Sequence, residues 1–130
     1  MTQDHANVGL LKQLDIGNIP GNADLFSEDF IWHYFNPKLP EIQGDYVGLA
    51  GLRDFFQNLG SLTRGTFKSE PQSVTAYGDE LVVAHARNTL AMDGRSLEID
   101  AIVVWRIVGG RIVEAWDIPS VYTVASQTND

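Results

Sequence analysis

The sequence predicts an α+β fold in which helices cover one face of a mostly antiparallel sheet. Segments with helical apolar spacing and one aromatic strand occupy the first half of the chain. Four long apolar runs occupy the second half, and they are divided by Gly78-Asp79, Asp93-Gly94 and Gly109-Gly110, dipeptides typical of tight hairpin turns. Helices followed by a meander of strands are typical of the α+β class, and 130 residues suit one domain, 1–130.

The first half supplies the predicted helices and one strand. Residues 8–14 have the apolar spacing of a short amphipathic helix that Gly17 ends, and 23–26 follow Pro20-Gly21 as a second short helix. The aromatic run FIWHYF (30–35) predicts a strand, and the segment 36–46, with two prolines and a glycine, predicts a loop. Residues 49–62 carry apolar side chains at a period of about 3.6 and form the clearest helix.

The second half predicts strands at 67–77, 80–92, 95–108 and 111–118. A two-residue turn at Asp93-Gly94 pairs Met92 with Arg95 and places Arg87 opposite Asp100, where their charges are complementary. These two charged residues then share one face of the sheet. The opposite face is apolar, should meet the helices, and contains Ala86, Asn88, Leu90, Ile99, Ala101, Val103 and Trp105.

Composition argues against several classes of protein. The net charge of −8, without a Lys/Arg cluster, argues against nucleic-acid binding. No apolar run approaches the roughly 20 residues of a membrane span. The chain has no cysteine, which is compatible with the cytoplasm, and its three histidines lack metal-ligand spacing. We therefore expect a cytoplasmic protein without metal, with flexible tails at 1–6 and 124–130.

Five segments carry a resemblance to a known family: DLFSEDFIWHYF (24–35), GDYVGLAGLRDFFQNL (44–59), GTF (65–67), DGRSLE (93–98) and VVWRIVGGRIVEAWDI (103–118). In this order they resemble the SnoaL-like group, named after a polyketide cyclase, within the nuclear transport factor 2-like superfamily that includes ketosteroid isomerase. The resemblance implies a cone-like fold, with three N-terminal helices packed on a curved sheet that encloses a pocket. It also implies a homodimer formed through the outer sheet face.

The resemblance to ketosteroid isomerase does not extend to its catalytic groups. The positions of its oxyanion tyrosine, basic aspartate and protonated aspartate fall on Leu10, Tyr34 and Val103. None of these side chains can perform the matching step near neutral pH, because a phenol titrates near 10 and the other two are apolar. The sequence therefore predicts that the protein is not a steroid isomerase of that type.

The resemblance to the SnoaL-like cyclases implies a different acid–base site. The resemblance implies an aspartate that acts as acid or base in an apolar pocket, with a histidine nearby and no metal or cofactor. Asp117 lies in the matching last strand and is the first catalytic candidate. His33 is the second, although strand alternation places it on the outer face if its neighbours Trp32 and Tyr34 line the pocket.

Whether Asp117 faces the pocket depends on the turn at Gly109-Gly110. A three-residue loop with a glycine bulge would bring Val113, Ala115 and Asp117 to the face that carries Val103 and Trp105. A plain two-residue turn would bring Ile112, Glu114 and Trp116 there instead. On the second arrangement Asp117 is a strand-end carboxylate that accepts structural hydrogen bonds.

Six residues are predicted to bind ligand: Trp32, Tyr34, Phe56, Asn88, Val103 and Trp105. Tyr122 is a further aromatic candidate, and the alternative is that these rings fill the core. Asn88 is the polar residue on the inward face and needs a partner, either a ligand or Asp117 or Tyr34.

The predicted ligand is a small hydrophobic carbonyl compound, polyketide-like in character. Two functions stay open: cofactor-free proton transfer of the cyclase or isomerase type, and a non-catalytic ligand-binding or dimeric interaction module. An epoxide hydrolase would need an Asp-Arg-Asp group, whereas Arg87 and Asp100 pair on the outer face. Apolar residues predicted for the dimerising outer face are Val74, Val82, Ala84, Ile102 and Val104.

Overall fold

The computed structural model describes residues 5–14, 18, 20–122 and 125–126. Its helices are α1 (Ala6–Gln13), the 3-10 helix η2 (Pro20–Leu25) and α2 (Gly48–Leu62). Its strands are β1 (Phe26–Tyr34), β2 (Gly44–Val47), β3 (Lys68–Tyr77), β4 (Leu81–Met92), β5 (Arg95–Val108), β6 (Arg111–Pro119) and β7 (Ala125–Ser126). Of the helices in this described part of the chain, none has the length and apolar character that crossing a lipid bilayer requires.

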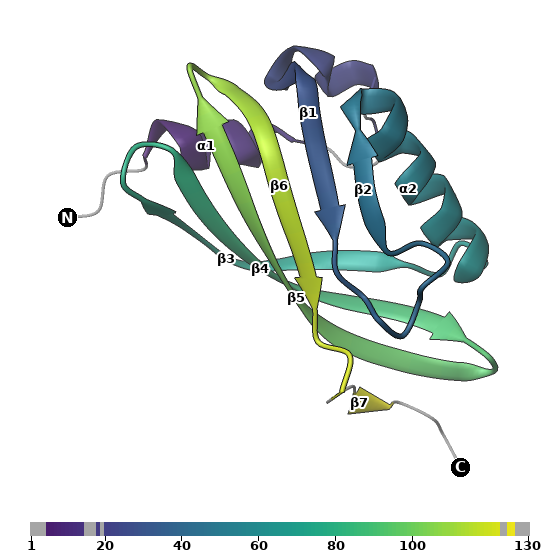
Figure 1. Ribbon diagram of the computed structural model, residues 1–130. Helices are drawn as coiled ribbons and strands as arrows, with labels where there is room; N and C mark the ends of the chain where they lie inside the picture. The colour runs from purple at the N-terminus through teal and green to yellow at the C-terminus, as the bar shows by residue number, and fades with distance from the viewer. Residues whose placement is uncertain (1–4, 15–17, 19, 123–124, 127–130) are drawn as a thin grey trace.

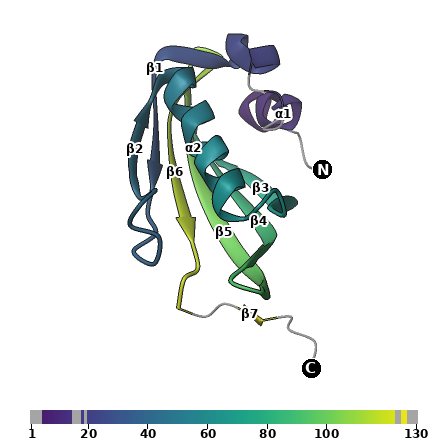
Figure 2. The same ribbon diagram turned by 90° about the vertical axis from the view of Figure 1, so that its right-hand side faces the viewer.

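The strands form one curved, unclosed sheet in the order β2-β1-β6-β5-β4-β3, with the short β7 added beside β5 (Figure 1). Neighbouring strands are antiparallel except β1 and β6, which are parallel. Figure 2 shows α1 and α2 on the same side of the sheet. The predicted α+β class is confirmed, and the concave face of the sheet is the one that the helices cover.

The helical part differs from the prediction in its second helix. Two α-helices are present among the described residues, and η2 stands where the second of three was expected. Asn22 leaves helical geometry, with φ −109° and ψ 15°, so η2 cannot continue as an α-helix. Phe26, expected at the end of that helix, instead begins β1 and is buried.

The predicted loop 36–46 contains the start of an additional strand, β2. Its sequence, GDYV, has no strand-like alternation, and it is held by antiparallel pairing with β1, including Trp32 with Tyr46. Gly51 allows α2 to approach this edge closely, because a Cβ there would lie 2.9 Å from the Tyr46 carbonyl carbon. α2 then buries Leu52, Phe55 and Leu59 against the sheet.

The meander has the predicted strands to within one residue at each end. Met92 pairs with Arg95 and Arg87 with Asp100, so the register derived from the Asp93-Gly94 turn is confirmed. The Arg87 Nε atom lies 3.9 Å from the Asp100 carboxylate on the exposed outer face. This position agrees with the expectation that the pair does not belong to a pocket.

The β5–β6 hairpin combines features of the two expected turns. Gly109 and Gly110 form a plain two-residue turn, with φ values of 61° and 79°, and Val108 pairs with Arg111. The register then shifts, because Ile107 pairs with Ile112 whereas Arg106 pairs with Glu114. The extra residue between these pairs is Val113, so the bulge lies within β6 and not in the turn.

This displaced bulge has the same effect on facing as a bulged turn. Ala115 is paired with Trp105, and Asp117 is paired with Val103. Directly paired residues share a face of the sheet, so Asp117 joins the concave side. Trp116 points to the outer side, where its ring stacks on His33.

Three residues predicted for the outer face lie on the concave face instead. Val82 is fully buried and paired with Trp105, and Ala84 is paired with Val103. Val74 is paired with Ala84, because Tyr77 pairs with Leu81 and the turn between β3 and β4 is therefore three residues long, one more than expected. The prediction for Val82 and Ala84 was wrong because strand alternation places both on the face of Ala86 and Asn88, which the sequence had already assigned to the helices.

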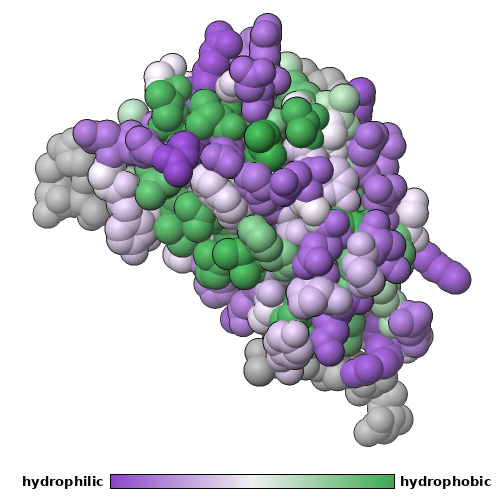
Figure 3. All heavy atoms as spheres, in the orientation of Figure 1, coloured by the Kyte–Doolittle hydropathy of each residue, from purple (hydrophilic) through white to green (hydrophobic). Residues whose placement is uncertain are grey.

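The outer face keeps the other two predicted residues, Ile102 and Val104. Ile102 is exposed, as is Ile118, with which it is paired. Figure 3 views this face, where hydrophobic patches are separated by hydrophilic side chains.

The predicted tails fall largely outside the described residues. Residues 1–4, 124 and 127–130 are among those that the structure does not describe. His5, by contrast, caps α1 by accepting a hydrogen bond from the Asn7 backbone N–H at 3.1 Å. Ala125 and Ser126 pair with β5.

Candidate functional site

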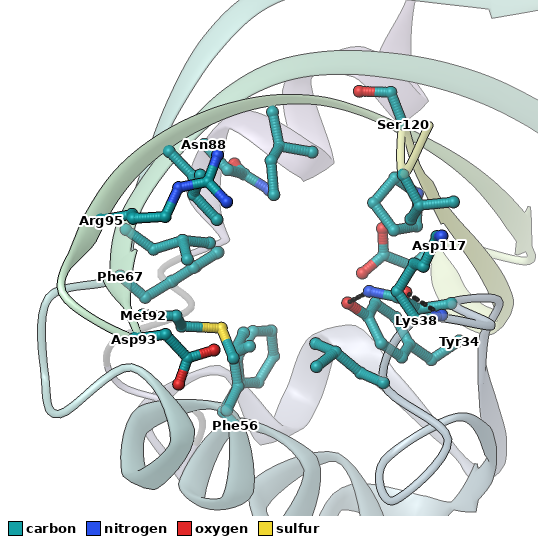
Figure 4. A pocket seen from close by; sticks show the side chains of 18 residues that line it. Tyr34, Lys38, Phe56, Phe67, Asn88, Met92, Asp93, Arg95, Asp117 and Ser120 are labelled. Carbon is teal, nitrogen blue, oxygen red and sulfur yellow. Dashed lines mark hydrogen bonds between the residues drawn. The ribbon is translucent and has the colours of Figure 1, made fainter. Parts of the chain in front are cut away.

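A cavity opens between the concave face of the sheet, α2 and the 36–43 loop (Figure 4). Its first part, called the front lobe, has a volume of about 300 Å³, within the range of small-molecule sites. The front lobe is lined by apolar residues of α2, β4 and β5 and by polar residues from β1, the 36–43 loop and β6. The polar and charged residues in its lining are Tyr34, Asn36, Lys38, Asn88, Asp93, Arg95, Asp117 and Ser120.

A second part, called the rear lobe, has a volume of about 190 Å³. It extends toward α1 and β3, and its walls include Leu11, Leu14, Trp32, Val74, Ala84, Val103 and Trp105. Four residues line both lobes, Phe56, Phe67, Asn88 and Asp117, so the lobes adjoin at these side chains. Apart from these shared side chains, the rear lobe is largely apolar and aromatic.

Asp117 lies where the two lobes adjoin. It is paired with Val103 on β5 and with Tyr34 on β1, and Figure 4 shows its carboxylate directed toward the cavity. Among the described residues, no hydrogen bond reaches this carboxylate, whereas its backbone carbonyl accepts one from the Phe35 N–H at 3.0 Å. Burial raises the pKa of Asp117 from 3.8 to about 7. The group is therefore poised to exchange a proton near neutral pH.

Tyr34 lies beside Asp117 and remains a proton donor. Burial, with the Asp117 charge as a smaller contribution, raises the pKa of Tyr34 to about 12, although a hydrogen bond from Asn36 acts in the other direction. The Asn36 side-chain amide donates to the Tyr34 hydroxyl at 2.9 Å. Because this bond uses the oxygen as acceptor, the Tyr34 O–H is free to donate to a molecule in the cavity.

Asn36 is a site residue that sequence reasoning missed. Its side-chain oxygen accepts a hydrogen bond from the Lys38 backbone at 3.0 Å, forming a turn closed by the asparagine side chain. This arrangement holds the amide in a buried position, with 4% of the residue exposed. The Asn36-Pro37 pair did signal a turn, but not the direction of its amide.

Charged residues at the front lobe were also missed. Lys38 comes from the 36–43 loop, and Asp93 and Arg95 come from the β4–β5 turn. The curvature of the sheet brings these segments to the same cavity, and that curvature is not visible in a strand pattern.

The six predicted ligand-binding residues all line the cavity. Tyr34 belongs to the front lobe, Trp32, Val103 and Trp105 belong to the rear lobe, and Phe56 and Asn88 belong to both. The rings also pack together, since the Trp32 centroid lies 5.6 Å from that of Trp105 and 5.9 Å from that of Phe56. Tyr122, by contrast, is highly exposed, and its ring lies 4.9 Å from Lys38 Nζ.

Two buried polar atoms of cavity-lining residues have no hydrogen-bond partner among the described residues. Trp32 is only 2% exposed, and its Nε1 donor makes no hydrogen bond. The Asn88 side-chain oxygen is likewise buried without a partner. In the same part of the chain, no hydrogen bond joins the Asn88 side chain to Asp117 or Tyr34. Buried polar groups normally find partners, and these two are exceptions.

His33 lies on the opposite face of the sheet from Asp117. Its Nδ1 is 2.7 Å from the Asp45 carboxylate, its Nε2 is 2.6 Å from the Glu114 carboxylate, and its ring stacks on Trp116. Burial lowers the pKa of His33, but hydrogen bonds and charge from Asp45 and Glu114 outweigh it and raise the pKa above 6.5. The histidine therefore links three strands and does not reach the cavity.

The other two histidines make structural contacts. His85 is among the residues that line the rear lobe, but its Nε2 is 2.8 Å from the Asp100 carboxylate. His5 caps α1. Within the part of the chain that the structure describes, no three His, Cys, Asp or Glu side chains are grouped as metal ligands.

Comparisons with known proteins agree with this architecture. The family model of the SnoaL-like domain matches residues 10–115. A search of curated proteins finds no match for the chain.

Several solved structures share the fold. Bal32a, from a soil-derived mobile gene cassette, is 24% identical, with a TM-score of 0.74 over 87% of this chain and 88% of that one. TerC, co-crystallised with polyporic acid, is 17% identical, with a TM-score of 0.74 over 88% and 91% of the two chains. A candidate SnoaL-like polyketide cyclase from Jannaschia sp. CCS1 is 17% identical, with a TM-score of 0.70 over 92% of each chain.

Proposed function

Because the chain belongs to the SnoaL-like domain family, we propose that it binds a small hydrophobic carbonyl compound and catalyses proton transfer on it without a cofactor. The observation that carries this proposal is the Asp117 carboxylate, which burial holds at a pKa of about 7 in the wall of an apolar cavity. A general base is most effective when its pKa lies near the working pH.

In the proposed reaction, the ionised Asp117 removes a proton from the carbon next to the substrate carbonyl. The electron pair of the broken C–H bond moves to the carbonyl oxygen and forms an enolate. The Tyr34 O–H, which the Asn36 contact leaves available, donates a hydrogen bond to that oxygen. If the substrate also carries a carbon–carbon double bond β,γ to the carbonyl, the intermediate is a dienolate, and protonated Asp117 returns its proton to the γ carbon, which moves the double bond into conjugation and completes an isomerisation.

A ring closure follows from the same intermediate. The enolate carbon attacks a second carbonyl carbon of the same molecule, a C–C bond forms, and the Asp117 proton passes to the new alkoxide. A polyketide-like substrate carries the two carbonyls that this aldol step needs. TerC, a fold relative crystallised with polyporic acid, and the candidate polyketide cyclase from Jannaschia sp. CCS1 support this choice of substrate class.

The test is the exchange of substrate protons with solvent. In deuterated water, NMR follows loss of the signal from the protons next to the ketone of tetralone, an aromatic bicyclic ketone. We expect the protein to accelerate this loss, with a rate that rises with pH through about 7. We expect Asp117→Asn to lower the rate by about 10²–10⁴-fold.

The matched control is Asp54→Asn, the same substitution on the exposed side of α2. It should exchange at the wild-type rate. Equal rates in the wild type and Asp117→Asn would contradict the assignment of Asp117 as the base.

The second candidate function is ligand binding without chemistry. The largely apolar and aromatic lining of the rear lobe favours it, because such a lining binds a ligand without supplying a base. Under this function tetralone binds to the wild type and to Asp117→Asn with similar affinity, and no exchange is accelerated.

We further propose that the protein is a cytoplasmic homodimer. The support for the dimer is the exposed apolar side chains on the outer sheet face, chiefly Phe35, Ile102 and Ile118. The support for the compartment is the absence of cysteine from the sequence. The acidic surface that follows from a charge of −8 does not favour nucleic acid or an anionic membrane as partner.

A further inference from the structure

Two cationic side chains line the front lobe of the cavity, and the proposed reaction uses neither of them. They are Lys38, from the 36–43 loop, and Arg95, the first residue of β5, and neither lines the rear lobe. Figures 1 and 2 both show the 36–43 loop and the start of β5 at the same end of the sheet. The fold therefore brings two positive charges that are distant in the sequence to one end of the cavity.

Both cations are available to a ligand. Among the residues that the structure describes, no carboxylate forms an ion pair with Lys38 or Arg95. The Lys38 ammonium lies 4.9 Å from the centroid of the Tyr122 ring, a contact that orients the ammonium without neutralising its charge. Both residues are exposed, so an anion can reach them from solvent.

The charges in the lining favour an anion with a single negative charge. Asp93, in the β4–β5 turn, also lines the front lobe, so the two cations exceed it by one positive charge. Asp117 is the fourth charged residue of the lining, and it lies where the lobes adjoin. Repulsion by the ionised Asp117 therefore keeps an anion beside Lys38 and Arg95 and leaves the apolar part of the cavity to an uncharged group.

The chemistry of the guanidinium narrows the anion to a carboxylate. Its planar N–H groups match the two oxygens of a carboxylate, whereas the lysine ammonium acts as a point charge. Figure 4 shows Arg95 and Lys38 on opposite sides of the cavity. Arg95 is therefore the group suited to hold the carboxylate, and Lys38 adds a second positive charge from the other side.

We infer that the ligand carries a carboxylate, which Arg95 binds and Lys38 attracts, at the end of an apolar body that occupies the front lobe. This inference rests on the part of the proposed function that places a small molecule in the cavity, and not on catalysis by Asp117. It assigns Arg95 and Lys38 as the residues that select an acid over a neutral compound of the same shape.

Three probes of similar shape and different charge test the inference. 2-Naphthoate is an anion, 2-naphthamide is its neutral analogue, and 2-naphthylmethylammonium is a cation. Titration calorimetry at neutral pH and low salt measures the dissociation constant of each. We expect the wild type to bind naphthoate about 5–30-fold more tightly than naphthamide, and the ammonium probe no more tightly than naphthamide.

Removal of the cations should remove this preference. Arg95→Gln and Lys38→Gln should each reduce the preference for naphthoate over naphthamide by about 2–5-fold, and the double variant should abolish it. The affinity for naphthamide should not change, which separates lost charge recognition from a damaged cavity. The matched control is the double variant Lys68→Gln/Arg111→Gln, which removes two exposed cations that line neither lobe and should keep the preference.

A measurement on the wild type does not depend on any variant. Raising the salt concentration from about 20 to about 500 mM should weaken the binding of naphthoate and leave that of naphthamide unchanged, because salt screens the attraction between charges. The inference is overturned if the wild type shows no preference for naphthoate or binds none of the probes. It is also overturned if the preference survives in Lys38→Gln/Arg95→Gln, or falls equally in the control pair.

The outcomes also separate this inference from the proposed reaction, whose probe, tetralone, is uncharged. A preference for naphthoate that depends on Arg95 and Lys38, without proton exchange on tetralone, leaves the carboxylate site standing and removes the enzyme. Proton exchange on tetralone without a preference for naphthoate leaves the enzyme standing and removes the carboxylate site.

Discussion

Tyr34 and Asp117 are direct partners in the parallel pairing of β1 with β6, and both side chains line the front lobe of the cavity. This pairing places a proton donor with a pKa of about 12 next to a carboxyl with a pKa of about 7. The two groups therefore hold different protonation states near neutral pH, the combination that acid–base chemistry on a carbonyl requires.

Asp117→Asn should stabilise the protein at high pH. The folded-state pKa of Asp117 is raised, so the wild type loses stability as the pH rises from 3.8 toward about 7, and the loss is complete above that value. The amide removes the buried charge, and we expect a gain of up to about 4 kcal/mol above pH 7 that disappears below 3.8. Urea denaturation across this pH range measures it, and a gain that does not depend on pH would contradict the buried-charge explanation.

Tyr34→Phe should destabilise the protein through Asn36. Removal of the hydroxyl leaves the buried Asn36 amide without the acceptor that now lies at 2.9 Å. We expect a loss of about 1–3 kcal/mol in the free energy of unfolding. Tyr77→Phe, which removes a hydroxyl from an exposed ring, should change it by less than about 0.5 kcal/mol. Equal effects of the two substitutions would show that the Asn36 contact contributes nothing.

His33→Gln should remove a loss of stability that the wild type shows as the pH rises above 6.5. The raised pKa of His33 means that its stabilising effect is complete below 6.5 and is lost as the pH rises through the folded-state value. The wild type should therefore lose stability over this interval, and the variant should not. His85→Gln, at a single-carboxylate contact on the same face, is the control for removing an outer-face imidazole. Parallel pH profiles for the wild type and His33→Gln would exclude this contribution.

Ile118→Lys should convert the proposed dimer to a monomer. Ile118 and its partner Ile102 are exposed at the outer face, and a lysine there would place a charge in an apolar contact. Light scattering should give twice the chain mass for the wild type and a single chain mass for the variant. Val108→Lys, beside the Gly109-Gly110 turn, should remain dimeric. A monomeric wild type at micromolar concentration would refute the dimer.

Local patterns predicted most of the fold, because turns and alternation depend on near neighbours in the chain. The Asp93-Gly94 dipeptide alone determined the pairing of Met92 with Arg95 and of Arg87 with Asp100. The apolar period of 49–62 located α2, and the family resemblance located Asp117 in the last strand. The pairing of β2 with β1 was missed, because four residues without alternation form a strand only when a neighbouring edge is available.

The sequence by itself determined the fold class, the meander and the residues able to line a pocket. Tertiary structure alone decided what those residues face. A single extra residue, Val113, moves every later side chain of β6 to the other side of the sheet, and so turns Asp117 inward. Curvature of the sheet then brings Asn36 and Lys38 to the same cavity as Arg95. Facing and burial depend on contacts between distant segments, and burial is what brings the pKa of Asp117 to about 7.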